Sequence, residues 1–527
     1  MKNPRRGLLA LLLALSILLP LFAAVPASAE ETEPATETTE AARQIADLDL
    51  VTDSDGFNHL HSLFDTNINL GYNSSKEVSF LTLEHPEGIG SLYLIFGKAY
   101  GPYTITDNAS GQVCTGGENG FLHEFIDLTV LFGEAPTSVT LNFSNGKVNI
   151  CELMAYTQGE VPHTVQKWET PKEDATDLIL FSTHDDDAQL FFAGILPYYA
   201  GELGYEVLVV YMTDHPGEPH RVHELLNGLW AVGVTTYPVT KSFPDFRLMH
   251  DLKGTYATYK ALGYPREVLL EYVVEQLRRF KPQVAIGHDI NGEYGHGMHL
   301  VYTDLLMEAV TISNDPTYYP ELAEKYGLWD VPKTYLHLYE ENQIVMDWDQ
   351  PLSKFNGLTA FEVTKSIGFP HHVSQYRVFA PYHVPYTYAT EIPTYNPCYY
   401  GLYRSTVGAD VEKNDFFENV LTYEQQIQKA EEERLAAEAE AKRQEEERLA
   451  AEAEAKRQEE ERLAAEEAAR QEEQRRQAEL KAAQEAALAA EAARRRNLII
   501  ALCAGGVVIV AAILVFAFRN RKRGRYE

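Results

Sequence analysis

The sequence has little cysteine. Four cysteines occur in 527 residues, and none belongs to a Cys-x-x-Cys pair. Metal sites built from thiolates are therefore excluded, and any metal must be held by histidine and carboxylate side chains. In an oxidising compartment Cys114 could form a disulfide with Cys151, and Cys398 would then be unpaired. The sequence does not decide whether this disulfide forms.

Basic residues are also scarce. Lysine and arginine total 45 against 77 aspartates and glutamates, which gives a formal net charge of −32. A nucleic-acid partner is excluded, because phosphate binding requires clustered positive charge. The acidic balance is compatible with a solvated extracellular surface.

Glycine and proline are absent from residues 423–496, where Ala, Glu, Lys, Arg and Leu dominate. The string EEERLAAEAEAKRQ occupies 431–444 and recurs at 445–458. This composition predicts one long charged helix stabilised by pairs four residues apart. Leu435, Leu449 and Leu463 recur only every fourteen residues, whereas a coiled coil needs two apolar positions per heptad. We expect a single helical stalk, with a weak coiled-coil homodimer as the alternative.

Charge is absent from residues 498–518, a run that at ~20 residues is long enough to cross a bilayer. The basic residues of 519–527 then predict a cytoplasmic tail. A wall-sorting signal is the rival interpretation, but no sorting motif precedes the run. We therefore expect one transmembrane helix that makes the membrane a partner of the chain.

The N-terminus predicts export. Residues 1–29 combine a basic start, an apolar run and an Ala-Ser-Ala cleavage pattern, which together are typical of a secretory signal peptide. An uncleaved membrane helix is the alternative. The predicted location is the cell membrane, with a single crossing and the globular domains outside the cell.

Two globular blocks lie between these ends. Residues 30–45 are predicted to be a linker, because they are largely acidic and rich in threonine. Residues 46–160 contain short apolar runs separated by Gly, Pro, Asn and Asp, which predicts a β-sandwich.

Residues 176–420 alternate apolar strands with helices, which predicts an α/β fold with a mostly parallel sheet covered on both faces. Ligands of such sheets bind beyond the carboxyl ends of the strands. The expected strands are 178–181, 207–211 and 284–286, and the expected helices are 189–199 and 221–232.

Polar residues follow two of these strands. The sequence Thr-His-Asp-Asp-Asp at 183–187 comes directly after the first strand, and His184 and Asp187 lie three residues apart across a strand-to-helix turn. Zinc accepts histidine nitrogen and carboxylate oxygen, and three adjacent aspartates repel one another unless a cation compensates them. A solvated acidic turn or a helix N-cap is the alternative for this motif alone.

A second motif follows the strand 284–286. It contains three histidines in twelve residues, and His296 and His299 share one face of a helix that starts near Gly297. Two histidines and one carboxylate with an open position are the ligands of a catalytic zinc site. Ferrous iron also suits such a set.

The two motifs resemble the PIG-L/LmbE family of zinc-dependent de-N-acetylases. The family's A-H-P-D-D-E is matched by T-H-D-D-D-A at 183–188, and its H-P-D-H by H-G-M-H at 296–299. Arg221 and Glu224, followed by A-V-G-V at 231–234, resemble an R-x-x-E and L-G-V segment, and 372–375 resembles H-x-S-Q. The resemblance implies a Rossmann-like sheet over 176–420.

The resemblance also implies roles. His184, Asp187 and His299 would bind zinc, and Asp186 would be the general base. His296 would stabilise the oxyanion and assist departure of the amine. Arg221 would contact the substrate. The implied substrate is an N-acetylated amino-sugar glycan or glycoconjugate.

Three positions depart from the family pattern. Asp185 replaces a proline, Ala188 replaces a glutamate, and Met298 replaces an aspartate. The last two changes remove carboxylates that would support the ligands and tune the metal. Nearby Glu293, Asp289 and His288 are candidates to compensate.

The sandwich ends in a segment, 148–156, that resembles the last strand of discoidin or galactose-binding modules. This implies a carbohydrate-binding module, with a packing domain as the alternative. For the whole chain we expect an extracellular N-deacetylase. The rival is a non-catalytic surface glycan-binding or adhesion protein with a degraded deacetylase domain, and a metal-dependent amidase acting on a non-sugar substrate is a third possibility.

Overall fold

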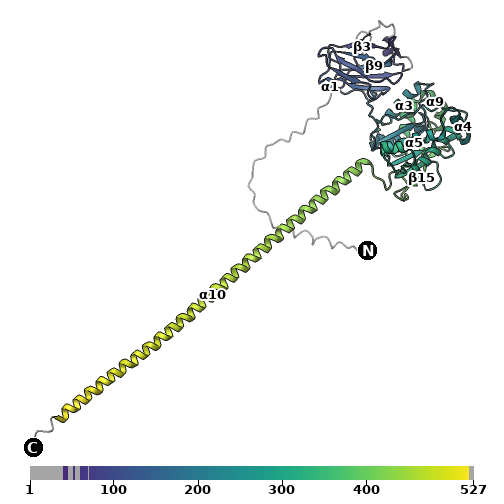
Figure 1. The fold of residues 1–527 in the computed structure, drawn as a ribbon. Coiled ribbons are helices and arrows are strands. Elements are labelled where there is room, and N and C mark those ends of the chain that lie inside the picture. Colours follow the sequence, from purple (N-terminus) through teal and green to yellow (C-terminus); the bar gives the residue numbers. More distant parts are fainter. Residues whose placement is uncertain (1–39, 46–50, 54–59, 69–70, 522–527) are drawn as a thin grey trace, which may run out of the picture. The chain divides into compact units, whose positions relative to one another are not determined.

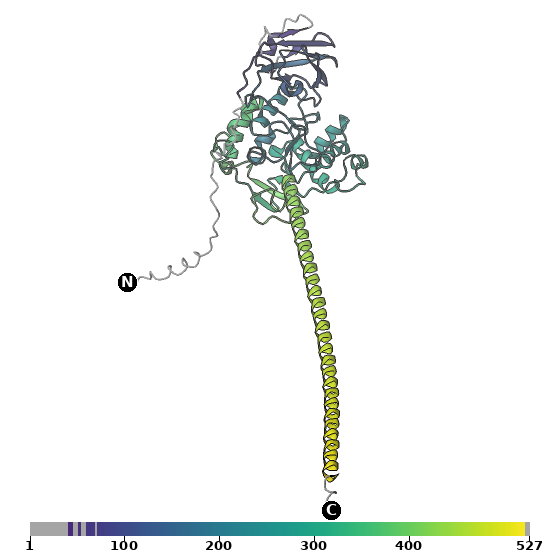
Figure 2. The same cartoon turned by 90° about the vertical axis from the view of Figure 1, so that its left-hand side faces the viewer.

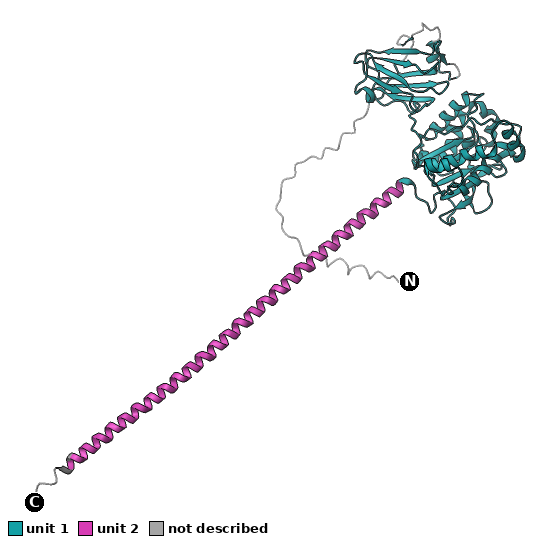
Figure 3. Ribbon diagram, viewed as in Figure 1, with its two compact units in different colours: residues 1–423 teal, residues 424–527 magenta. Residues whose placement is uncertain are grey.

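The computed structural model describes residues 40–45, 51–53, 60–68 and 71–521. The chain divides into two compact units, 1–423 and 424–527 (Figure 3). The predicted signal peptide, most of the predicted linker and the end of the predicted cytoplasmic tail lie outside the described residues. The last linker residues are described, and Ala41 and Gln44 form backbone bridges to Glu160 and Tyr156 of the sandwich.

The first domain of unit 1 contains two antiparallel sheets, ordered β1-β3-β8-β5-β6 and β2-β9-β4-β7 (Figure 1). Alternate residues face inward along β3 and β5, so that Leu81, Leu83 and Ile105 are almost fully buried in a shared core. The elements are β1 (Val51–Asp53), η2 (Leu60–Leu63), β2 (Tyr72–Asn73), β3 (Ser79–Glu84), β4 (Ser91–Phe96), β5 (Tyr103–Asp107), β6 (Val113–Gly116), β7 (His123–Asp127), α1 (Leu128–Phe132), β8 (Ser138–Phe143) and β9 (Asn149–Tyr156).

The cysteines of this domain are unpaired. Cys114 lies on β6 of one sheet and Cys151 on β9 of the other, and both are free thiols, as is Cys398. The pairing that the sequence left open is therefore not made in the structure.

The second domain of unit 1 is built on a six-stranded sheet ordered β11-β10-β12-β13-β15-β14. The first four strands are mutually parallel, whereas β15 pairs antiparallel with both β13 and β14. The strands are β10 (Leu178–Ser182), β11 (Val207–Tyr211), β12 (Val284–Gly287), β13 (Lys333–His337), β14 (Gln343–Val345) and β15 (Tyr399–Ser405).

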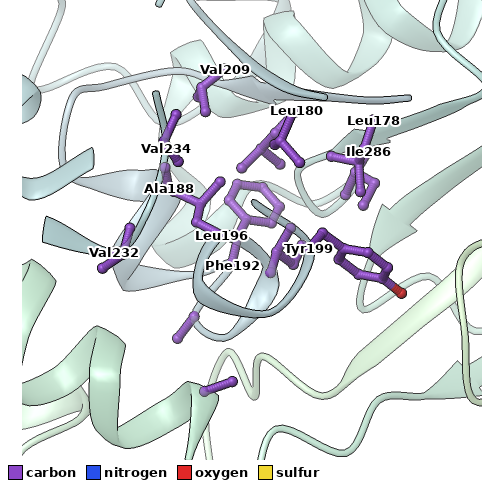
Figure 4. Packing of buried hydrophobic residues seen from close by; sticks show 14 of the residues in the cluster. Leu178, Leu180, Ala188, Phe192, Leu196, Tyr199, Val209, Val232, Val234 and Ile286 are labelled. Atoms are coloured by element: carbon purple, nitrogen blue, oxygen red, sulfur yellow. The ribbon is translucent and has the colours of Figure 1, made fainter. Parts of the chain in front are cut away.

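Helices bury both faces of this sheet. Leu178 and Leu180 point into one core, in which Phe192, Leu196 and Tyr199 pack against them (Figure 4), whereas intervening strand residues join a second core with α5 and α6. The helical elements are α2 (Asp187–Leu190), η3 (Leu196–Glu202), α3 (His220–Ala231), α4 (Leu252–Ala261), α5 (Arg266–Phe280), η4 (Glu293–Gly295), α6 (Gly297–Ile312), α7 (Pro320–Tyr326), α8 (Ala360–Val363), η5 (Thr364–Gly368), η6 (Phe369–His371), α9 (Val373–Phe379), η7 (Ala380–Tyr382) and η8 (Ala389–Glu391).

The helix expected over 189–199 is not continuous. The structure has α2 and then η3, a π-helical segment, with a break around Gly194. Gly194 has φ +99°, and a Cβ there would lie 2.4 Å from the ring of Trp348. The buried indole therefore needs a glycine in a left-handed conformation, which ends the helix.

The two domains of unit 1 contact each other through aromatic and polar side chains. Phe121 of the sandwich stacks on Tyr237 at a centroid distance of 4.3 Å, and the Tyr237 hydroxyl accepts a hydrogen bond from the Leu122 amide. His123 of β7 and His223 of α3 are also in hydrogen-bond contact, at 2.8 Å. These contacts attach the sandwich to α3 and to the segment that follows it.

Unit 2 is a single helix, α10 (Tyr423–Arg521), which runs unbroken in both views (Figures 1 and 2). Repeated Arg–Glu ion pairs three or four residues apart follow its surface, for example from Arg434 to Glu431 and Glu438. Its C-terminal part is long and apolar enough to cross a membrane. Leu435, Leu449 and Leu463 are half exposed, so whether a second copy covers them stays a prediction.

Glu152 is a buried carboxyl group of the sandwich whose ionisation affects the stability of this domain. Burial and the negative charge of Asp65 raise the pKa of this carboxyl to about 7. Ionisation of Glu152 therefore destabilises the fold. This destabilisation is absent below the pKa of the carboxyl in the unfolded chain, near 4.5, and is complete above pH 7. We expect Glu152→Gln to raise the free energy of unfolding by about 1–3 kcal/mol at pH 8 and by little at pH 4.5.

Thermal melting at the two pH values measures this difference. Glu134→Gln, a change at an exposed glutamate of the same domain, is the control. An equal effect of Glu152→Gln at both pH values would contradict the assignment.

Candidate active site

The two polar motifs meet at one edge of the sheet. His184 and Asp187 follow the carboxyl end of β10, whereas His296 and His299 follow β12. The two strands are parallel neighbours, with Leu180 opposite Ile286. Residues that follow them must therefore lie side by side, as ligand-binding residues do in such sheets.

Three donor atoms converge there. His184 Nδ1 lies 2.9 Å from Asp187 Oδ2 and 3.1 Å from His299 Nε2. The distance from His299 Nε2 to Asp187 Oδ2 is 3.0 Å. All three side chains are buried, so the structure brings together the three predicted ligands.

The donor set fits a divalent metal. Two imidazole nitrogens and one carboxylate oxygen at mutual contact are ligands that zinc and ferrous iron accept. Burial lowers the pKa of His184 and His299, but the carboxylates of Asp187, Asp245 and Glu293 outweigh it and leave these pKa values at about 10 and about 9. The site therefore favours positive charge between these side chains.

Two other triads of buried donors overlap this set, His184–His296–His299 and Asp187–His288–His299. His288 is already engaged at both nitrogens, because Nε2 accepts the Thr183 amide at 3.0 Å and Nδ1 contacts Glu293 at 2.8 Å. We therefore favour His184, Asp187 and His299 as the metal-binding set, with His296 beside it.

Asp186 lies at the edge of a cavity of about 260 Å³ whose lining also includes His184, Arg221 and His296. Burial raises the pKa of Asp186 to about 7, the charges of Asp185 and Asp187 add to the effect, and Arg221 opposes it. A carboxyl group with a pKa near neutrality can both accept and release a proton.

Arg221 is held by acidic residues. Its guanidinium forms a two-pronged contact with Asp185, in which Nε donates to Oδ2 at 2.9 Å, and Nη2 also donates to Asp186 Oδ1 at 3.1 Å. Asp185, the residue at the family's proline position, therefore anchors an arginine that also contacts Asp186. Arg221 also lines the cavity, and its contact with substrate stays a prediction.

His296 faces the same cavity. Its Nε2 lies 3.8 Å from Asp245, and its Nδ1 is buried without a hydrogen-bond partner among the described residues. Burial, with the neighbouring His184 and His299, lowers the pKa of His296 to about 3. A neutral imidazole is therefore available to a ligand in the cavity.

Glu293 contacts three histidines, among them the predicted ligand His299. Its carboxylate contacts Nδ1 of His299 at 2.7 Å, Nδ1 of His288 at 2.8 Å and Nδ1 of His337 at 2.7 Å. These contacts direct Nε2 of His299 toward Asp187 and hold the ring in place. The sequence raised Glu293 only as one of three candidates, and nothing in it linked His337 to the site.

Sequence reasoning also missed part of the cavity wall. Asp245, Arg247 and Tyr294 line it, and Tyr294 has φ +45°, a strained conformation for a tyrosine. Asp245 and Arg247 lie in a segment without regular structure, so no strand or helix pattern singles them out.

Comparison with known proteins decides the family. Residues 179–310 match the family model described as PIG-L: GlcNAc-PI de-N-acetylase. This domain belongs to the PIG-L/LmbE family. The matched residues include both motifs of the site.

Curated relatives are similar over the same region. A 1D-myo-inositol 2-acetamido-2-deoxy-alpha-D-glucopyranoside deacetylase of Catenulispora acidiphila is 27% identical over 211 residues, which are 36% of this chain and 64% of that protein. One of Streptomyces scabiei is 22% identical over 293 residues, 46% of this chain and 89% of that protein. The structure of N,N'-diacetylchitobiose deacetylase from Pyrococcus horikoshii aligns with TM-score 0.29 and 17% identity over 43% of this chain and 83% of that one.

In the PIG-L/LmbE domain, two residues that differ from the family motifs are packed in apolar cores. Ala188 and Met298 are fully buried and belong to the apolar cores on opposite faces of the sheet. Ala188 therefore fills space where the family pattern has a carboxylate. On the other side, Met298 packs in the apolar core, and the carboxylate that contacts His299 comes from Glu293.

The later family motifs meet as well. Ser374 donates to Glu224 from its amide at 3.0 Å and from its hydroxyl at 2.7 Å. The neighbouring Gln375 lines the cavity. The R-x-x-E and H-x-S-Q segments, 150 residues apart, therefore form one wall of the site.

Proposed function

We propose that this chain is a zinc-dependent hydrolase, anchored in the cell membrane and facing outward, that removes the acetyl group from an N-acetylated amino sugar of a glycan. The PIG-L/LmbE family consists of metal-dependent N-deacetylases, and the similar curated proteins are named for an acetamido-sugar substrate. The observation that carries the proposal is the convergence of His184, Asp187 and His299 next to a cavity that His184 and Asp186 line.

His184, Asp187 and His299 would hold the metal. A bound zinc ion supplies Lewis-acid chemistry, because it polarises an acyl carbonyl and makes water a better nucleophile at neutral pH. Ferrous iron is the alternative metal for the same ligands.

Asp186 would move the protons. Its carboxylate takes a proton from the attacking water as the water oxygen bonds to the acyl carbon. When the carbon–nitrogen bond breaks, the proton passes to the amine, which leaves as the free amino sugar, and the acid leaves as acetate. The pKa near neutrality allows Asp186 to act in both directions.

Two further side chains would position the reaction. Neutral His296 offers a hydrogen bond to the acyl oxygen as negative charge develops there. Arg221, fixed by Asp185, holds the Asp186 carboxylate toward the cavity.

The test is acetate release from a panel of N-acetylglucosamine-containing oligosaccharides by purified, zinc-loaded protein. The proposal expects release that a chelator abolishes and zinc restores. A protein that binds no metal and releases no carboxylic acid from the panel would favour the glycan-binding alternative.

The membrane anchor has its own prediction. The apolar part of α10 is the proposed span, with the basic residues after it in the cytoplasm and the globular unit outside. We expect deletion of residues 498–527 to move the protein from the membrane fraction to the culture medium. Protease added to intact cells is expected to digest the wild-type globular unit, and complete protection from it would contradict the proposed sidedness.

A further inference from the structure

A second cavity, of about 500 Å³, opens between the sandwich and the start of α3. The sandwich contributes β2, the residues just after β4, and β9, whereas the α/β domain contributes the first turn of α3. Its polar lining consists of Asn73, Lys98, Lys147, Asn149, His220 and His223.

The lining is positive in an otherwise acidic chain. Lys98 and Lys147 are exposed, and neither makes an ion pair within the part of the chain that the structure describes. Over the same described residues, no aspartate or glutamate lines the cavity. With a net charge of −32 for the whole chain, two unpaired lysines at one cavity make it a local attractor for anions.

Glycines keep the floor of the cavity open. A Cβ at Gly71 would lie 2.2 Å from Asn149 Oδ1, and a Cβ at Gly97 would lie 2.1 Å from the same atom. A side chain at either position would therefore displace the Asn149 amide from its place in the cavity. The Asn149 amide donates to Asn73 Oδ1 and lines the cavity. Amide groups in such positions can form hydrogen bonds with sugar hydroxyls.

His223 adds a buried polar group that faces the cavity. Its side chain is 2% exposed, and its Nδ1 contacts His123 Nε2 at 2.8 Å. Its Nε2 has no hydrogen-bond partner among the described residues, and the residue lines the cavity. The N-terminus of α3, twelve residues long, adds the positive end of a helix dipole.

The first turn of α3 separates this cavity from the catalytic one. His220 and His223, three residues apart, line the second cavity, whereas Arg221 lines the catalytic cavity and Glu224 contacts its Ser374 wall. A helix with its side chains is about 10 Å across. A ligand that fills both cavities must therefore be an oligomer.

We propose that this cavity is a subsite for an acidic sugar, whose carboxylate or phosphate binds Lys98 and Lys147 while a neighbouring N-acetyl group enters the catalytic cavity. The substrate class is then an anionic amino-sugar polysaccharide. This inference rests on the proposed deacetylase function and specifies its substrate.

Steady-state acetate release by the full-length, zinc-loaded protein in detergent tests the subsite. Three probes are compared: a neutral tetramer of N-acetylglucosamine, a tetrasaccharide of alternating N-acetylglucosamine and glucuronate, and an N-acetylglucosamine oligomer carrying phosphate. We expect the double variant Lys98→Gln/Lys147→Gln to raise KM about 5- to 30-fold for the better acidic probe. Its kcat on that probe and both constants on the neutral probe are expected to stay unchanged.

The matched control is Lys253→Gln/Lys260→Gln, which removes two exposed lysines of α4 and is expected to leave all constants unchanged. Whichever acidic probe responds identifies the anion. Equal KM values of wild type and double variant on both acidic probes, or an equal loss on the neutral probe, would overturn the subsite and leave the deacetylase function standing. If no probe is hydrolysed, the proposed function fails, and calorimetric binding of the same probes decides the subsite alone.

Discussion

Asp186→Asn is expected to lower kcat for acetate release by about 10²–10⁴-fold, the usual contribution of a general base. The amide keeps the shape of the side chain but cannot take the proton from water. Burial disfavours the ionised form of Asp186, since its pKa is raised to about 7. The neutral variant should therefore fold at least as stably as the wild type at pH 8.

The measurement is acetate release together with metal content and thermal melting. Metal content is expected to stay at the wild-type level, because Asp186 is not among the proposed ligands. Asp330→Asn, at an exposed ion pair with Arg404, is the control and should change nothing measurable. A variant Asp186→Asn that retains more than about a tenth of the wild-type rate would show that another group is the base.

Glu293→Gln is expected to weaken zinc binding by about 10–100-fold. The carboxylate contacts Nδ1 of His288, His299 and His337, and a glutamine amide offers only one oxygen for these three imidazoles. His299 would lose the contact that fixes its tautomer and aims Nε2 at Asp187.

A chelator-competition titration measures the zinc affinity of this variant. Glu324→Gln, at an exposed glutamate of α7, is the matched control. Excess zinc is expected to restore acetate release by Glu293→Gln, a rescue that a merely misfolded variant would not show. Wild-type affinity in Glu293→Gln would mean that the ligands need no support from this carboxylate.

Much of the domain could be predicted, because its strands are short apolar runs. Strand β11 matches its prediction at both ends, and β10 and β12 extend one residue beyond theirs. Histidines and aspartates directly after such strands must gather at one edge of a parallel sheet. The meeting of His184, Asp187 and His299 followed from that rule, whereas the mutual distances of their donor atoms came only from the structure.

Other parts depend on contacts between distant residues. The helix expected over 189–199 is broken because Trp348, more than 150 residues later, packs against Gly194. His337 reaches Glu293 because β13 lies beside β12. Asp245 approaches His184 from a segment without regular structure. Local patterns carry no signal for such pairings.

The most direct test of a zinc-dependent hydrolase is the rate of acetate release plotted against bound metal. Metal-free protein is titrated with zinc, and both quantities are measured on the same sample for wild type and His299→Ala. We expect no release without metal, a rate that rises in proportion to bound zinc, and neither tight binding nor release in His299→Ala. Full acetate release by metal-free protein, or unchanged zinc binding in His299→Ala, would contradict this expectation.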